Sequence, residues 1–112
     1  MLIMIAGPYR SGSDDPEKWE QNLSFLNMCA VEVAAKGHVP IIGVNAFLPV
    51  IEEAGHHSYE QLMMPNCLKL AERCDAVLRI GGPSRGADQE VDVFSARELP
   101  VYHSVEDIPV AI

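Results

Sequence analysis

Short, mostly apolar runs alternate along this chain with longer segments in which apolar residues are three or four positions apart. A continuous apolar run predicts a strand that is buried on both faces, as in parallel sheets. Runs of this kind occur at residues 2–6, 38–42, 76–80 and 100–102. The three- and four-residue spacing predicts amphipathic helices. This spacing occurs at residues 16–36, 58–74 and 86–98. Residues 43–57 hold Pro49 and Gly55 among apolar residues, and we interpret them as a loop with a broken helix.

The alternation of strands and helices predicts an α/β fold, a three-layer sandwich with a small parallel sheet of about four strands. We expect the flavodoxin-like strand order 2-1-3-4 and a single domain over residues 1–112. Right-handed crossovers place the loops after the first three strands at one edge of the sheet. The segments Gly7–Ser13, Gly43 onward and Gly81–Glu90 should therefore converge where ligands bind in open α/β sheets.

The charge balance limits the partners that this protein can have. Its 112 residues carry a formal net charge of −8, whereas nucleic acids and anionic membranes attract a basic surface. We therefore expect neither nucleic acid nor a membrane as a partner, and no apolar run reaches the roughly 20 residues that span a bilayer. The three cysteines form neither a CxxC pair nor a zinc-binding spacing, which is typical of proteins in the reducing cytoplasm.

Two loops that follow predicted strands hold the candidate chemistry. Glu90 follows a Gly/Pro/Ser turn and lies in the first turns of a helix, whose N-terminus should hold the carboxylate ionised or attract a phosphate. An ionised carboxylate can act as a nucleophile on a sugar carbon. Alternatively, Glu90 only suits the helix dipole and Ser84 is only an N-cap. Arg10 and Arg85, two of the eight basic residues, fall in these loops and suggest local anion binding.

The first of these loops, Gly7–Ser13, matches neither the GxGxxG motif nor the P-loop, so dinucleotide or triphosphate binding is poorly supported. Its glycines, hydroxyl groups and arginine could cradle one phosphate or ribose, or the segment is a surface turn. The adjacent residues His56 and His57 have diverging side chains, so we predict no metal site there.

The segments Ile5–Arg10 and Pro83–Glu90 resemble the nucleoside 2-deoxyribosyltransferase-like superfamily. The chain looks closest to the small bacterial and phage members of that group, which is related to the hydrolases that split nucleoside 5′-monophosphates into base and sugar phosphate. The resemblance implies that Glu90 is the nucleophile and that the Tyr9 hydroxyl group orients it. It also implies a set of substrate-binding residues, in which Ser84, Arg10 and Arg85 favour a phosphorylated substrate. This set is Gly7, Arg10, Ser11, Ser84, Arg85 and Gly86.

Asn66 marks a departure from the pattern of the superfamily. Several members carry an aspartate near the leaving base, and by count that position is close to Asn66. Asparagine can form a hydrogen bond to a base but cannot protonate it. We therefore include Asn66 among the substrate-binding residues, without a role as general acid.

We expect the protein to cleave or transfer an N-glycosidic bond in a nucleoside or nucleoside 5′-monophosphate, with no metal or organic cofactor. The alternative is a non-catalytic domain that binds a nucleotide or sugar phosphate as a sensor, which Asn66 favours. An FMN-binding flavodoxin module is poorly supported, because the first loop lacks a Ser/Thr-rich phosphate pattern. Apolar residues in 44–51 and at Met63 and Met64 are expected to contact a second copy, in a homodimer or higher homo-oligomer.

Overall fold

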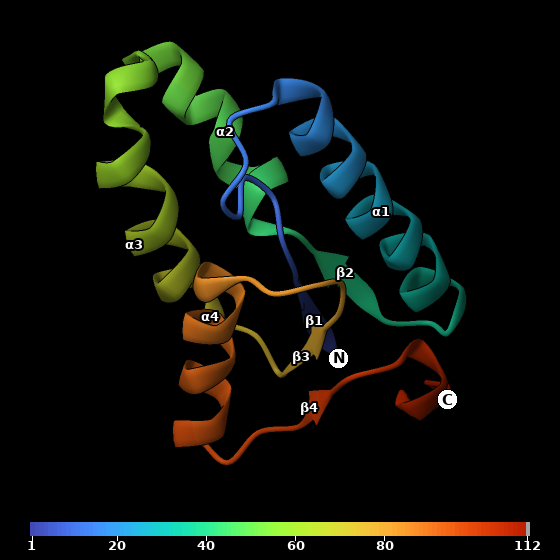
Figure 1. Cartoon of the computed structure of the whole chain (residues 1–112). Coiled ribbons are helices and arrows are strands. Elements are labelled where there is room, and N and C mark those ends of the chain that lie inside the picture. The colour runs from blue at the N-terminus through green and yellow to red at the C-terminus, as the bar shows by residue number, and fades with distance from the viewer. Residues whose placement is uncertain (112) are drawn as a thin grey trace.

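Four parallel strands form the central layer of the computed structural model, which describes residues 1–111 (Figure 1). The strands are β1 (Leu2–Ala6), β2 (Val39–Ile41), β3 (Ala76–Arg79) and β4 (Val101–Tyr102). Their order is β2-β1-β3-β4, and each neighbouring pair is parallel. The α/β fold and the flavodoxin-like strand order expected from the sequence are therefore confirmed.

Helices cover both faces of this sheet. They are α1 (Pro16–Ala35), α2 (Gly43–Ala54), α3 (Tyr59–Ala71) and α4 (Arg85–Ala96), with the 3₁₀ turns η1 (His56–Ser58) and η2 (Val105–Asp107). One face is covered by α1, and the other by α2, α3 and α4 (Figure 1). No helix within residues 1–111 is long and apolar enough to cross a lipid bilayer.

The side chains of β1 alternate between two apolar cores. Ile3 and Ile5 pack with Leu26 of α1, whereas Met4 and Ala6 pack into the core beneath α2, α3 and α4. None of these four strand residues is more than 2% exposed. Because both faces are buried, the strand is a continuous apolar run rather than an alternating one.

The segment interpreted as a loop with a broken helix is the continuous 12-residue helix α2, so that interpretation is wrong. Pro49 lies inside the helix, where its missing N–H and its ring cost about 3 kcal/mol. Ile51 is 1% exposed, and Phe47 and Leu48 pack against the same core. Each such side chain contributes about 1.5–3 kcal/mol when fully buried. The burial of this apolar face therefore outweighs the proline, and the helix ends only at Gly55, whose φ is +104°.

The long helix α1 begins and ends at the residues that local patterns indicate. The Asp15 side chain caps its start by accepting a hydrogen bond from the Glu17 N–H at 3.0 Å, and Pro16 is the first helical residue. Gly37, with a φ of +89°, follows the last turn. These ends fix the position of α1 beside the loop that follows β1.

Candidate functional site

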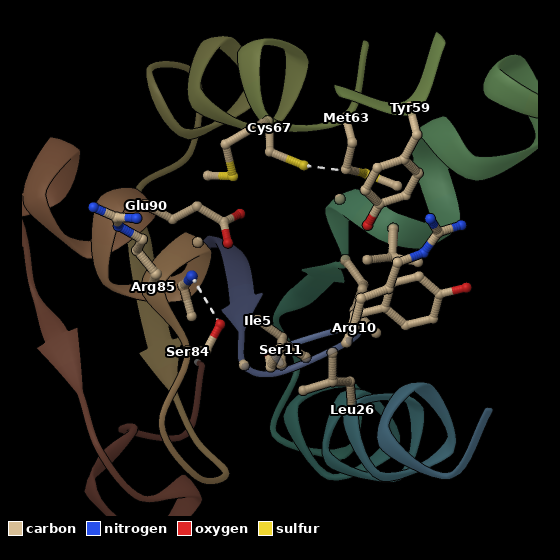
Figure 2. Close-up of a pocket in the computed structure, with 18 residues that line it drawn as sticks. Ile5, Arg10, Ser11, Leu26, Tyr59, Met63, Cys67, Ser84, Arg85 and Glu90 are labelled. Atoms are coloured by element: carbon tan, nitrogen blue, oxygen red, sulfur yellow. Dashed lines mark hydrogen bonds between the residues drawn. The ribbon is translucent and has the colours of Figure 1, made fainter. Parts of the chain in front are cut away.

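A cavity of about 180 Å³ lies at the carboxyl edge of the sheet, beyond the ends of β1 and β3 (Figure 2). Ligands bind at this edge in open α/β sheets, where the strand order changes direction. The three loops that the topology predicts to converge all line the cavity, and α3 contributes a further wall. Every residue that the sequence placed in the site lines this cavity, except Asn66.

Two side chains of α1 fix the loop that follows β1. The Asn22 amide donates to the Tyr9 carbonyl group at 2.8 Å, and the Trp19 indole N–H donates to the Ser13 carbonyl group at 2.7 Å. Between these anchors, the Ser13 N–H donates to the Arg10 carbonyl group at 2.8 Å and closes a tight turn. The backbone of Arg10 is therefore held from both sides.

Two glycines allow the chain to approach closely at the cavity. A Cβ atom at Gly7 would lie 2.6 Å from the carbonyl oxygen of Ile80, so only glycine lets the chain leave β1 beside the end of β3. A Cβ atom at Gly43 would collide with the Cys67 sulfur. The loops after β1 and β2 can therefore line the cavity only with glycine at these positions.

The Arg10 guanidinium lies against aromatic rings and has no carboxylate partner within residues 1–111. Its Cζ atom is 3.7 Å from the centroid of the Tyr59 ring and 4.2 Å from that of the Trp19 ring, which are favourable cation–π distances. Its Nε atom is buried and has no hydrogen-bond partner among the residues that the structure describes. The ion pairs found in residues 1–111 involve other arginines. In a protein of net charge −8, an unpaired guanidinium on a cavity wall is suited to bind an anion.

Glu90 lies in the second turn of α4 and is 8% exposed. Burial raises the pKa of its carboxyl group from 4.5 to about 8, although the nearby Arg79 cation lowers it. The helix dipole acts mainly within the first turn and does not offset this burial. The expectation that the helix N-terminus holds Glu90 ionised is therefore wrong for the free protein, in which the carboxyl group is mostly protonated at pH 7.

Cys67 is the side chain that α3 presents to the cavity near Glu90 (Figure 2). Burial, together with the charge of Glu90, raises the pKa of the Cys67 thiol to about 12, so it is a poor proton donor. The preceding residue, Asn66, lies outside the cavity lining, and its amide donates to the Leu62 carbonyl group at 2.7 Å. On this part of α3, Cys67 therefore lines the cavity and Asn66 does not.

Tyr59, which the sequence did not single out, directs its hydroxyl group into the cavity from α3, opposite Glu90 on α4 (Figure 2). Burial raises its pKa to about 12, despite the neighbouring Arg10 cation, so the O–H group remains a donor. Tyr9 also lines the cavity, but its ring packs near Trp19 with the centroids 6.3 Å apart, and no hydrogen bond to Glu90 is drawn among the cavity residues. Tyr59 belongs to no sequence motif. Its position at the sheet edge could be predicted only if the segment before it, α2, were recognised as a helix.

Ser84 and the residues after it form the start of α4. The Ser84 hydroxyl oxygen accepts a hydrogen bond from the Ala87 N–H at 3.2 Å and is thus an N-cap. The N–H groups of Arg85 and Gly86 precede this bond and belong to the helix end, where such donors are free to bind anions. The Arg85 side chain is exposed, and Figure 2 shows its guanidinium turned away from Glu90. The two arginines of the predicted site therefore do not converge.

No protein-family model, curated protein or solved structure matches this chain. The chemistry of the cavity is thus the basis for inferring a function. It joins the Arg10 guanidinium, the first N–H groups of α4, a phenol and a buried carboxyl group. Its volume lies below the roughly 300–1,000 Å³ of pockets for drug-sized ligands. This size suits a small molecule, or one part of a larger ligand that extends out of the cavity.

Proposed function

We propose that this chain is a member of the nucleoside 2-deoxyribosyltransferase-like superfamily and cleaves or transfers the N-glycosidic bond of a nucleoside 5′-monophosphate. The observation that supports this proposal best is that a buried carboxyl group and an unpaired guanidinium share one small cavity. The Arg10 guanidinium suits a phosphate. Glu90, on the opposite side of the same cavity, suits the anomeric carbon of the attached sugar (Figure 2).

In the proposed reaction, a carboxylate oxygen of Glu90 attacks the anomeric carbon and forms a glycosyl ester as the bond to the base breaks. The electron pair of the broken bond goes to the base nitrogen, which takes a proton from water. A water molecule or a second base then attacks the anomeric carbon and displaces the Glu90 carboxylate. The products are a sugar phosphate or a new nucleotide, and no step draws on a metal or an organic cofactor.

The raised pKa of Glu90 sets the pH at which this reaction is fast. Only the carboxylate form is a nucleophile, and the carboxyl group of the free protein titrates at about 8. We therefore expect kcat/KM to rise about tenfold per pH unit below this value and to level off above it. If kcat/KM instead falls as the pH rises through about 8, Glu90 acts as a proton donor.

Glu90→Gln tests the proposal, because it retains the size of the side chain and removes the nucleophile. Base release from a panel of nucleosides and 5′-monophosphates, measured by liquid chromatography, should fall by orders of magnitude. The affinity for ligand should change far less, since the lost interaction forms in the transition state. Glu53→Gln, at an exposed position on α2, is the matched control and should leave base release unchanged. Unchanged base release in Glu90→Gln would exclude the mechanism.

The second candidate function is binding of a nucleotide or sugar phosphate without chemistry, as a sensor domain. It is favoured by the burial of Glu90, which raises the pKa of its carboxyl group to about 8, and by the weakly acidic Cys67 thiol that α3 places in the cavity. The same panel separates the two functions. A sensor binds a 5′-monophosphate and releases no base at any pH at which the protein is folded.

We also propose that the protein lies in the reducing cytoplasm, where the three buried cysteines stay unpaired. We further propose that it forms a homodimer. In the segments expected at the contact, Ile51 is 1% and Met63 5% exposed, whereas Val50 is 53% exposed. A larger group of exposed apolar side chains lies along one side of α1. Phe25, Met28 and Val31 are 46%, 66% and 69% exposed. This side of α1 is therefore the contact that we propose.

A further inference from the structure

Tyr59 connects the two ends of the cavity. Its ring lies 3.7 Å from the Arg10 guanidinium, and its hydroxyl group enters the cavity from the wall opposite Glu90 (Figure 2). No hydrogen bond from this hydroxyl group to the other cavity residues is drawn in Figure 2. One side chain thus supports the cation and also presents a donor of its own.

The Arg10 side chain is positioned before any ligand binds. Its backbone is anchored through α1, and its guanidinium is stacked on Tyr59 and lies over Trp19. A solvated arginine samples many rotamers, and ordering it during binding weakens a complex. Because the two rings already restrict Arg10, the other N–H groups of its guanidinium can bind an anion with little reorganisation.

We propose that Tyr59 sets the preference of this cavity for a phosphorylated sugar. Its ring holds the Arg10 guanidinium toward the phosphate, and its hydroxyl group donates to a sugar oxygen that lies between Arg10 and Glu90. The identity of the ligand rests on the proposed function, but the role of Tyr59 is tested by binding alone. Burial keeps the Tyr59 pKa at about 12, so the hydroxyl group stays a donor at the pH of the measurement.

The two roles of Tyr59 are separated by two substitutions. Tyr59→Phe keeps the ring on Arg10 and removes the donor, whereas Tyr59→Leu removes both. Arg10→Ala removes the cation itself. Tyr102→Phe on β4 and Arg73→Ala at an exposed position are matched controls, because neither residue lines the cavity.

Isothermal titration calorimetry with ribose 5-phosphate and ribose measures the preference as a ratio of the two affinities. We expect the wild-type ratio to be about tenfold or more. Tyr59→Phe should weaken both ligands by about three- to tenfold and preserve the ratio, as expected for one lost hydrogen bond. Tyr59→Leu should lower the ratio by about threefold or more through the loss of stacking. Arg10→Ala should bring it close to one, and the two controls should match the wild type.

Three results would overturn this inference: equal affinities in the wild type, a wild-type ratio in Tyr59→Leu, or a lost ratio in Tyr59→Phe. Circular dichroism checks that each variant is folded, and Tyr59→Met replaces Tyr59→Leu if that variant is not. The Arg10 Nε–H signal in nuclear magnetic resonance gives a second readout. It should move when inorganic phosphate is added to the wild type, and a signal that stays in place would also count against the inference.

The proposed function and this inference fail in different ways. A protein that binds ribose 5-phosphate through Tyr59 but releases no base from any nucleotide loses the proposed function and retains the role of Tyr59. A protein that releases base with the same phosphate preference in Tyr59→Leu retains the proposed function and loses the inference.

Discussion

The buried carboxyl group of Glu90 should make this protein less stable as the pH rises from 4.5 to about 8. The group titrates near 4.5 in the unfolded chain and near 8 in the folded protein. Between these values the folded protein holds a proton that the unfolded chain has released. The stability that is fully present below pH 4.5 is therefore lost as the pH rises through the folded-state pKa. At about 1.4 kcal/mol per pH unit, the loss amounts to about 5 kcal/mol, a large part of the roughly 5–15 kcal/mol that stabilises a typical domain.

Glu90→Gln removes this titration and keeps the shape of the side chain. Urea unfolding at several pH values between about 5 and 8 gives the free energy of unfolding of the wild type and the variant. We expect similar stabilities near pH 5 and a variant that is more stable by several kcal/mol near pH 8. Glu53→Gln, exposed on α2, controls for the change in net charge and should follow the wild type. A difference between wild type and Glu90→Gln that stays constant over this interval would refute the argument from burial.

Two further substitutions and one chemical modification have outcomes that follow from the structure. Gly43→Ala places a methyl group against the Cys67 sulfur, so it should lower the free energy of unfolding by about 1–3 kcal/mol in urea and weaken binding of ribose 5-phosphate. The Cys67 thiol, buried and with a pKa of about 12, should resist iodoacetamide at pH 8 in the native protein and react only after unfolding, as judged by mass spectrometry. If the homodimer forms through α1, Met28→Asp should give a monomer in light scattering at micromolar concentration, and a wild type that is already monomeric would contradict the dimer.

The fold could be predicted where local pattern and packing point to the same answer. The apolar run of β1 is covered on both faces, and α1 has a cap at Asp15 and a stop at Gly37, so sequence and structure agree there. For α2 they do not agree. Pro49 disfavours a helix locally, and the apolar face that overrides it becomes buried only when the helix packs against the sheet. The residues of α2 alone therefore do not reveal that their apolar face becomes buried.

The site could be predicted in outline, because topology alone brings the three loops to one edge of the sheet. The details depend on the rotation and depth of helices. Successive residues on a helix are turned by about 100°, so an error of one position separates Cys67 in the cavity from Asn66 outside it. The protonation of Glu90 depends in the same way on its burial beneath α3, which no local motif states.

The residues that line the cavity differ in how deeply they are buried in the two apolar cores. Ile5, Leu26 and Ala87 are at most 2% exposed and are shared with the cores on either side of the sheet, so substitutions there damage folding and binding together. Val44 and Met64 on α2 and α3 are only half-buried and border the same cavity. Natural variation or directed evolution can therefore change which ligand is accepted through this second pair, while the sheet beneath continues to specify the fold.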